Sequence, residues 1–274
     1  MQENPLAFVG SVPEHYDRLL GPFLFEPYAV HAAEIVLGSR PARILEVASG
    51  TGRVTRHLID GLDAGALLSV TDLSSDMLAI AQARLGASDN VRWEVADAAN
   101  LVYGDANFDA VVCQFGLMFL PDRLAGLCEW HRVLCPGGRL TYAVWDSLDA
   151  NPAWVIRDVL GEMFADGAPQ FMQLPHSMHD ADELGSITRR AGFADVVVDR
   201  VALTGRSPSA RDVASGFVYG TPLLASLTSF AADRIEELCE RLTGALITQF
   251  GDKPLSAPLS AYVVTASKGV ANDQ

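Results

Sequence analysis

The feature that most constrains the fold is an alternation of short β-rich runs with helical patterns between residue 40 and about 145. Such alternation is typical of a parallel sheet wound with crossover helices. The β-rich runs cover 42–48, 66–72, 91–97, 108–114 and 138–145. The helical patterns lie near 53–61, 75–85 and 121–134, with "CPGG" expected to end the third. We therefore expect an α/β fold with a doubly wound, mostly parallel sheet.

The pattern changes after residue 145. Helical stretches at 152–165 and 180–191 precede a strand at 193–203, a mostly helical segment at 207–256 and a last strand at 260–268. The segment 207–256 is too long for a hairpin loop, so we expect it to cover a functional opening.

Charge and composition narrow the choice of partner. The 274-residue chain carries a formal net charge of −14. Nucleic acids and anionic membranes attract clustered Lys and Arg, so we expect a small-molecule partner, no nucleic acid and no membrane. The N-terminus lacks the pattern of a signal peptide, and no run of about 18 apolar residues occurs. These features predict a cytoplasmic protein.

The cysteines give no sign of a metal centre. They form no CxxC pair and have no histidine at ligand spacing, so we expect buried free thiols and no metal. They are Cys113, Cys128, Cys135 and Cys239.

The stretch "ILEVASGTG" (44–52) places a glycine-containing turn after the first expected strand. Ligands of open α/β sheets bind at this position. Gly50 and Gly52 would let the backbone approach a ligand, and Ala48 and Ser49 are small. The turn alone is equally compatible with a purely structural role.

Two acidic residues end the next strands. Asp72 could accept hydrogen bonds from ribose hydroxyls. Its alternative role is to cap a helix, which Ser74 or Ser75 can do instead. A nicotinamide-binding pattern needs a third glycine, and Thr55 occupies that place. Asp97, followed by the small Ala98, could accept from an adenine amino group, so an adenosine ligand is indicated.

Five motifs in order, "EVASGTG", "TDLSSDM", "DAANL", "FDAVVCQFGLMFLPD" and "EWHRVLCPGGRL", closely resemble class I S-adenosylmethionine-dependent methyltransferases. The chain is most similar to the small-molecule enzymes of ubiquinone and menaquinone biosynthesis, with a methyltransferase type 11-like domain, over about 15 to 205. The resemblance implies a Rossmann-like seven-stranded sheet with its last strand antiparallel. It also implies an N-terminal helical cap and a helical insertion before the last strand.

The resemblance also assigns roles to individual residues. The methionine part of the cofactor would be lined by Glu46, Ala48, Gly50 and Gly52, and Tyr16 would reach its carboxylate. Tyr16 could equally be a half-buried core aromatic residue with a solvated hydroxyl. Asp72 would hold the ribose. The adenine would lie against Leu73, Met77, Asp97 and Ala98. Gln114 and Phe115 would face the sulfonium and the substrate. The family's first glycine is Ala48 here, which should alter packing slightly without abolishing binding.

The expected function is methyl transfer to a small, partly apolar acceptor such as a phenol, enol or quinol. No catalytic base is identified, although His15, His176 and His179 could face the substrate. Two alternatives stay open: a protein of this fold that binds the cofactor without methylating, such as a cyclase or sensor, and a nicotinamide-dependent oxidoreductase.

These expectations divide the chain into three parts: a cap at 1–40, a cofactor-binding domain at 41–206 and 257–268, and a lid at 207–256. Selectivity would reside in this lid together with 8–28, and the residues expected to line it are Phe217, Tyr219, Leu223, Leu224 and Phe230. A homodimer contact is the alternative for the lid.

Overall fold

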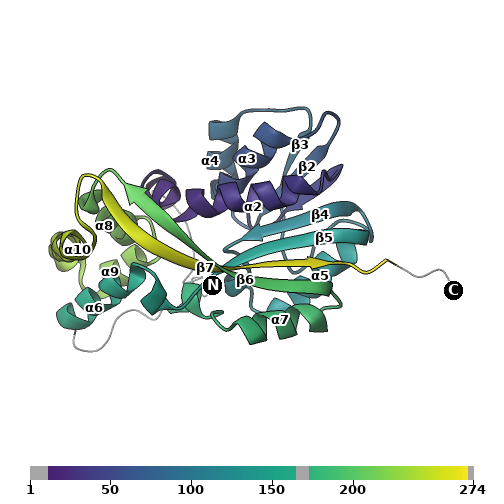
Figure 1. Cartoon of the computed structure of the whole chain (residues 1–274). Helices are drawn as coiled ribbons and strands as arrows, with labels where there is room; N and C mark the ends of the chain where they lie inside the picture. Colours follow the sequence, from purple (N-terminus) through teal and green to yellow (C-terminus); the bar gives the residue numbers. More distant parts are fainter. Residues whose placement is uncertain (1–11, 165–172, 271–274) are drawn as a thin grey trace. The chain divides into compact units, whose positions relative to one another are not determined.

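The computed structural model describes residues 12–164 and 173–270 (Figure 1). Every strand expected from the sequence is present. The strands are β1 (Arg43–Glu46), β2 (Leu67–Asp72), β3 (Val91–Val95), β4 (Phe108–Gln114), β5 (Leu134–Trp145), β6 (Ala194–Ser207) and β7 (Leu255–Ser267).

The helices follow the expected order as well. They are α1 (Val12–His15), the π-helical η1 (Tyr16–Phe25), α2 (Glu26–Gly38), α3 (Arg53–Gly61), α4 (Ser75–Leu85), α5 (Arg123–Val133), α6 (Ala153–Met163), α7 (Ala181–Arg190), α8 (Ala210–Tyr219), α9 (Leu223–Phe230) and α10 (Ile235–Phe250). The predicted helical N-terminal segment and the helices before the last strand are thus confirmed.

In the described part of the chain the strands form one seven-stranded sheet, in the order β3-β2-β1-β4-β5-β7-β6. β1 pairs in parallel with both β2 and β4, whereas β7 runs antiparallel to β5. The chain moves from β1 outward to β2 and β3 and then returns to add β4 on the other side of β1. The carboxyl ends of β1 and β4 therefore meet at a switch point, where open α/β sheets bind ligands.

Helices cover both faces of the sheet, which explains its nearly continuous apolar strands. Figure 1 shows α2, α3 and α4 on one side and α5 and α7 on the other. The first side buries Ala29, Ala32, Ala33, Val36, Val54, Leu58 and Leu78 from the helices against Ile44, Leu68, Val70, Val91, Ala110 and Val112 from the strands. On the second side, the hydroxyl oxygens of Tyr142 and Thr188 lie 2.8 Å apart, which ties β5 to α7.

The chain divides into two compact units. Unit 1 comprises the described residues within 1–27, 147–176 and 202–260, and unit 2 those within 28–146, 177–201 and 261–274. Unit 2 therefore contains β1 to β5, and β6 and β7 contribute residues to both units. Within unit 1, η1 packs on α8: a Cβ added at Gly216 would lie 2.7 Å from Leu20 Cδ2, so the contact requires a glycine.

The third predicted helix ends close to the expected place, because α5 ends at Val133, just before "CPGG". The strand after it begins earlier than the predicted 138–145, because β5 starts at Leu134. Phe108 pairs with Leu134, and the register then shifts so that Ala110 pairs with Arg139. Gly137, at a φ of 78°, lies in the extra stretch. The "CPGG" sequence is thus an irregularity at the start of β5.

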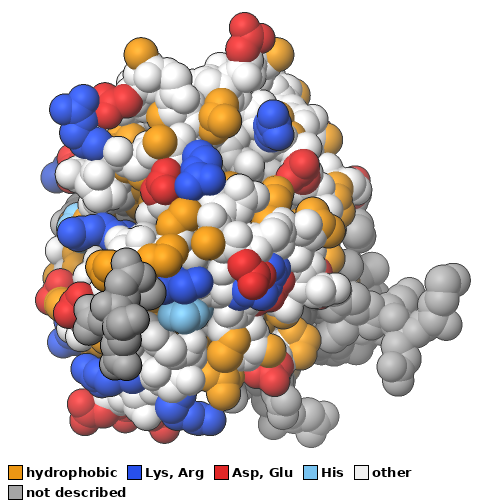
Figure 2. All heavy atoms as spheres, turned by 90° about the vertical axis from the view of Figure 1, so that its right-hand side faces the viewer, with side chains coloured by type: hydrophobic (Ala, Val, Ile, Leu, Met, Phe, Trp, Pro, Cys, Tyr) orange, Lys and Arg blue, Asp and Glu red, His pale blue; other side chains and the backbone are white. Residues whose placement is uncertain are grey.

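Charges of both signs are mixed on the face of the molecule that Figure 2 draws. Figure 2 shows one face, on which Lys and Arg side chains are interspersed with Asp and Glu. Several basic residues are paired, as in Arg40–Asp63 at 2.9 Å and Arg132–Asp105 at 2.7 Å. Among residues 12–164 and 173–270, no helix combines the length and the apolar character needed to span a membrane.

Candidate active site

The glycine-containing turn after β1 has the open geometry that its sequence predicts. Gly50 has a φ of 56°, and a Cβ added there would meet nothing within 4 Å. Gly52, at a φ of 75°, is different, because a Cβ there would lie 3.0 Å from that of Ala81 in α4. Gly50 therefore leaves the backbone accessible, whereas Gly52 allows α4 to pack closely.

Ala48, which replaces the expected first glycine, lies at a φ of 52°, in the left-handed region that disfavours side chains. Its methyl group packs against the turn after β4. A Cβ added at Gly116 would lie 2.5 Å from Ala48 Cβ and 2.8 Å from Cys113 Sγ. The turns after β1 and β4 are therefore in contact, and a glycine at 116 accommodates the extra methyl group.

Glu46 is a buried acid at the end of β1, with 2% of its surface exposed. Burial raises the pKa of its carboxyl to about 8, although a hydrogen bond from Thr55 opposes this shift. Thr55 Oγ1 donates to Glu46 Oε2 at 2.7 Å. The residue that occupies the place of a third glycine thus anchors the acid. This role of Thr55 was not predicted from the sequence, where its hydroxyl at the start of the next helix was the signal for it.

Asp72 stabilises both the turn after β1 and the turn after β2. Its Oδ2 accepts from the Gly50 N–H at 2.7 Å, and its Oδ1 accepts from the Ser74 N–H at 2.8 Å. Burial raises the pKa of this carboxyl, and the backbone N–H donors oppose the shift. The helix α4 is capped by Ser74, whose Oγ accepts from the Met77 N–H, so the predicted capping role of Ser74 is confirmed.

The neighbours of Asp72 differ in exposure. Leu73 is 69% exposed, and Met77 is buried on α4. The structure thus leaves the Leu73 side chain open to solvent beside the end of β2.

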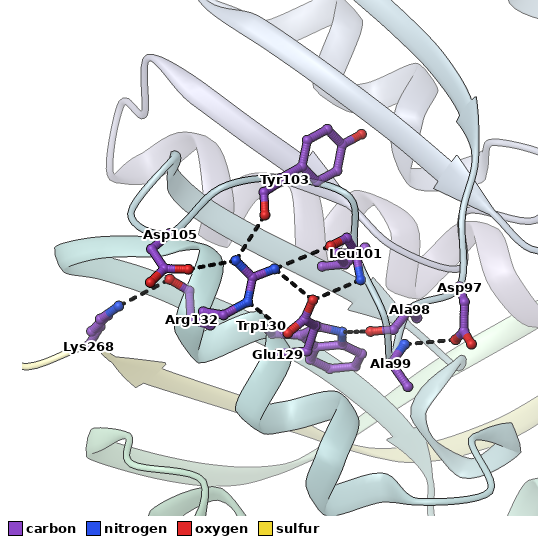
Figure 3. Close-up of polar contacts among 10 residues, drawn as sticks. All are labelled: Asp97, Ala98, Ala99, Leu101, Tyr103, Asp105, Glu129, Trp130, Arg132 and Lys268. Atoms are coloured by element: carbon purple, nitrogen blue, oxygen red, sulfur yellow. Dashed lines mark hydrogen bonds and ion pairs between the residues drawn. The ribbon is translucent and has the colours of Figure 1, made fainter.

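The loop after β3 carries Asp97 and Ala98 and is fixed by α5 (Figure 3). Asp97 Oδ1 accepts from the Ala99 N–H at 2.8 Å, and Ala98 O accepts from Trp130 Nε1 at 2.9 Å. The guanidinium of Arg132 donates to the backbone oxygens of Leu101 and Tyr103. Helix α5 therefore sets the backbone position of this loop.

A charged pair on α5 reinforces the same loop. Glu129 Oε1 accepts from the Leu101 N–H at 2.8 Å and from Arg132 at 2.7 Å. The hydrogen bond from Arg132 lowers the pKa of the Glu129 carboxyl. Glu129 thus stays ionised and satisfies a loop donor.

Gln114 is the last residue of β4, and Phe115 follows it at the same edge of the sheet. Phe115 lies at a φ of 56°, and its N–H donates to Ala143 O at 2.9 Å. Its ring stacks on Trp145, with centroids 3.8 Å apart and planes 4° apart. Tyr28 meets both rings edge-on. Neither Trp145 nor Tyr28 was predicted from the sequence as a site residue, although Trp145 lies at the end of a predicted strand.

The remaining candidates fall in different units. Tyr16, His15 and His176 belong to unit 1, and His179 belongs to unit 2. The Tyr16 ring stacks on Phe25 at 4.8 Å, and the His15 ring lies 6.0 Å from that of Tyr219. His176 is buried, whereas His179 is exposed. Their roles stay predictions.

The residues of the β1 turn fit the cofactor that the motifs imply. In the described part of the chain, Ser49 Oγ and Thr51 Oγ1 are buried without a hydrogen-bond partner. The Asp72 carboxylate has lone pairs beyond the two that bind backbone N–H groups. An open backbone, buried hydroxyls and a carboxylate acceptor suit a ligand with a ribose and polar ends. No group of three or more His, Cys, Asp or Glu within 12–164 and 173–270 could hold a metal ion.

Known proteins support the same assignment. The ubiE/COQ5 methyltransferase family matches residues 27–205. A demethylmenaquinone methyltransferase of Staphylococcus epidermidis is 28% identical over 202 residues, covering 69% of this chain and 84% of the relative.

Two solved structures share the fold. The cyclase SpnF has a TM-score of 0.55 and 22% identity, covering 90% of this chain and 83% of its own. A Haemonchus contortus N-methyltransferase, bound to phosphomonomethylethanolamine and S-adenosylhomocysteine, has a TM-score of 0.53 and 17% identity, covering 95% of this chain and 61% of its own. Because the family match covers more than half of the chain, this protein belongs to the ubiE/COQ5 methyltransferase family and is an S-adenosylmethionine-dependent methyltransferase.

Proposed function

We propose that the acceptor is a small, partly apolar molecule with a phenol, enol or quinol group, and that a quinol is the first candidate. The family match over residues 27–205 carries this proposal. The Staphylococcus epidermidis relative is named for demethylmenaquinone, which is a quinone. The rings of Phe115, Trp145 and Tyr28 are consistent with an apolar acceptor, because they give the end of β4 an aromatic surrounding.

The cofactor contacts form the second part of the proposal. Asp72 accepts from the ribose hydroxyls, and Asp97 accepts from the adenine amino group beside Ala98 and Leu73. Glu46 and the backbone at Ala48, Gly50 and Gly52 face the methionine part. Met77 supports the adenine side, Gln114 and Phe115 face the sulfur, and Tyr16 binds the methionine carboxylate.

When bound, S-adenosylmethionine supplies a methyl group activated by a sulfonium. In the transfer, an acceptor oxygen or carbon would form a bond to the methyl carbon while the bond between the methyl carbon and sulfur breaks. The electron pair of the broken bond would remain on sulfur. The products are the methylated acceptor, S-adenosylhomocysteine and a proton. The residues of the site align the two reactants and exclude water. An ionised acceptor needs no base, and for a neutral one His15, His176 and His179 are the candidates.

The test is a search for products 14 Da heavier by mass spectrometry. Full-length protein is incubated with S-adenosylmethionine and reduced demethylmenaquinone, with parallel arms of simpler phenols, quinols and polyketides. A product that requires both enzyme and cofactor supports the proposal. Cofactor binding without a product in any arm would contradict the acceptor class and favour a cyclase-like use of the fold. Binding of NADH in its place would favour an oxidoreductase.

We further propose that the segment 207–256 acts as a lid. The helices α8, α9 and α10 lie within it, and Leu224 is half-buried on α9. Phe217 and Leu223 are buried, and the Tyr219 hydroxyl donates to Glu236 at 3.0 Å. Phe217 and Leu223 are therefore already packed in the interior, and Tyr219 already has a hydrogen-bond partner within the segment. The Phe230 side chain and residues 8–11 lie outside the described parts of the structure.

Hydrogen exchange tests the lid. Closure should add protection over 207–256 when cofactor and acceptor analogue are present. Protection confined to the turns after β1, β2 and β4 would contradict it. Protection over 207–256 that depends on protein concentration instead of ligand would indicate a homodimer contact.

A further inference from the structure

Phe115 is a bulky aromatic residue in an unfavourable backbone conformation. Its φ of 56° lies in the left-handed region, which side chains of this size rarely adopt. Such a conformation persists only where the surroundings fix it, and these residues gather at functional sites. The neighbours of Phe115 therefore merit a functional explanation.

Two aromatic residues fix the Phe115 ring. Trp145 stacks on it with nearly parallel planes, 4° apart. Tyr28 contacts the Phe115 ring at 5.4 Å and the Trp145 ring at 5.5 Å, both edge-on. Both supports are themselves anchored: Trp145 pairs with Ala261 of β7, and the Tyr28 hydroxyl donates to Val201 O at 2.9 Å. The stack is therefore connected to the neighbouring strands β7 and β6.

The turn that carries Phe115 also touches the turn after β1. Gly116 has no room for a side chain, because Ala48 Cβ would lie 2.5 Å from it. A shift of the 115–116 turn would thus change the position of Ala48. The packing connects Trp145 to the β1 turn through Phe115 and Gly116.

We infer that Trp145 is a positioning residue for methyl transfer. Its indole holds the Phe115 ring and, through it, the 115–116 turn against Ala48, at the sulfur end of the cofactor. This inference rests on the proposed roles of Ala48 and Phe115. It adds a residue that no sequence motif of the site contains.

If Trp145 had only a structural role, its replacement would affect the binding of the two ligands in a different way. S-adenosylmethionine and S-adenosylhomocysteine differ only in the methyl group and the charge at sulfur. General loosening of the site would weaken both ligands by the same factor. Displacement of the turn beside the sulfur would change the ratio of their two dissociation constants.

The experiment measures both dissociation constants by calorimetry on the full chain. In Trp145→Leu the ratio should change by about threefold or more, as expected for coupled neighbours. Trp145→Phe keeps an aromatic face and should restore the wild-type ratio. Phe108→Leu is the matched control. Phe108 is buried at the opposite end of β4, edge-on to Tyr103 at 4.9 Å, and its loss should leave the ratio unchanged.

The possible outcomes distinguish a failure of the positioning role of Trp145 from a failure of the proposed function. An unchanged ratio in a folded Trp145→Leu would overturn the positioning role and leave the proposed function intact. If that variant does not fold, Phe115→Leu replaces it and should shift the ratio, and an unchanged ratio there would overturn the role equally. Wild-type protein that binds neither ligand would overturn both the proposed function and this inference.

Discussion

The turns after β1 and β4 each contain a residue in an unfavourable backbone conformation, and different interactions stabilise each turn. Each places a residue other than glycine at positive φ, 52° for Ala48 and 56° for Phe115. The β1 turn is held by hydrogen bonds, from the Ser49 N–H to Thr71 O at 3.0 Å and from the Gly50 N–H to Asp72 at 2.7 Å. In the β4 turn, the hydrogen bond from the Phe115 N–H to Ala143 O at 2.9 Å acts together with the stacked rings of Phe115 and Trp145.

This difference has a physical consequence. Hydrogen bonds to a carboxylate depend on its ionisation, whereas contacts between aromatic rings do not. The β1 turn should therefore respond to pH and to loss of a single acceptor. The β4 turn should respond to changes in volume and shape.

The largest expected effect concerns Asp72. Asp72→Ala removes the proposed acceptor for the ribose hydroxyls, and this loss should cost about 1.5–3 kcal/mol, or about 10- to 150-fold in cofactor affinity by calorimetry. It also leaves the Gly50 and Ser74 N–H groups without this acceptor, so the melting temperature should fall. Asp76→Ala, on the exposed first turn of α4, is the control and should change neither quantity. Unchanged affinity in Asp72→Ala would restrict Asp72 to holding the turns.

Gly116→Ala tests the contact between the two turns. The added methyl group would overlap Ala48 Cβ and Cys113 Sγ, and overpacking of this kind destabilises by about 1–3 kcal/mol in denaturant unfolding. Adding Ala48→Gly should recover part of the loss, because Cys113 still obstructs the new side chain. Gly104→Ala, where a Cβ meets nothing within 4 Å, is the neutral control. Strict additivity of the two changes would contradict the contact.

Glu46 should make stability depend on pH. Its pKa of about 8 in the folded protein exceeds the ordinary value of 4.5, so the folded state binds the proton more tightly. The stabilisation from this group is fully present below about 4.5 and is lost as the pH rises through about 8. In thermal unfolding across that window, Glu46→Gln should be less sensitive to pH than the wild type, whereas Phe115→Leu should keep the wild-type slope. If the thermal stability of wild type and of Glu46→Gln changed equally with pH, the raised pKa of Glu46 would be refuted.

The smallest effect is expected for Ala48→Gly alone. A left-handed alanine costs about 1–2 kcal/mol, and the flexibility of glycine in the unfolded chain offsets part of the gain. The net stabilisation should be about 0.5–1 kcal/mol. Ala106, at a φ of 53° on an exposed turn, provides the comparison, because Ala106→Gly should stabilise to a similar degree. A destabilising Ala48→Gly would mean that the methyl packing outweighs the backbone strain.

The sequence was sufficient to predict the sheet because its signals are local. Each strand is a short apolar run, and Ser74 precedes α4 as a recognisable cap. The ends of β1 and β2 were found for the same reason: Asp72 is the last residue of β2, and Gly50 lies in the turn that follows β1. Register irregularities were not predicted, because the pairing of Phe108 with Leu134 depends on a partner strand.

The residues that support the site through long-range contacts could not be predicted from local sequence signals. Trp145 stacks on Phe115 from a different strand, and Tyr28 reaches both rings from α2. The hydrogen bond from Trp130 to Ala98 O joins residues that are 32 positions apart. These contacts arise from the three-dimensional packing, so no periodicity in the sequence indicates them.

The burial of Cys113 gives the protein an internal reporter. Burial raises the pKa of this thiol to about 12, whereas Cys128 is exposed. Since the thiolate is the reactive form, an alkylating reagent should modify Cys128 in the native protein and reach Cys113 only during transient opening of the end of β4. The rate of alkylation at Cys113 would thus measure how often the carboxyl end of β4 opens, without any engineered probe.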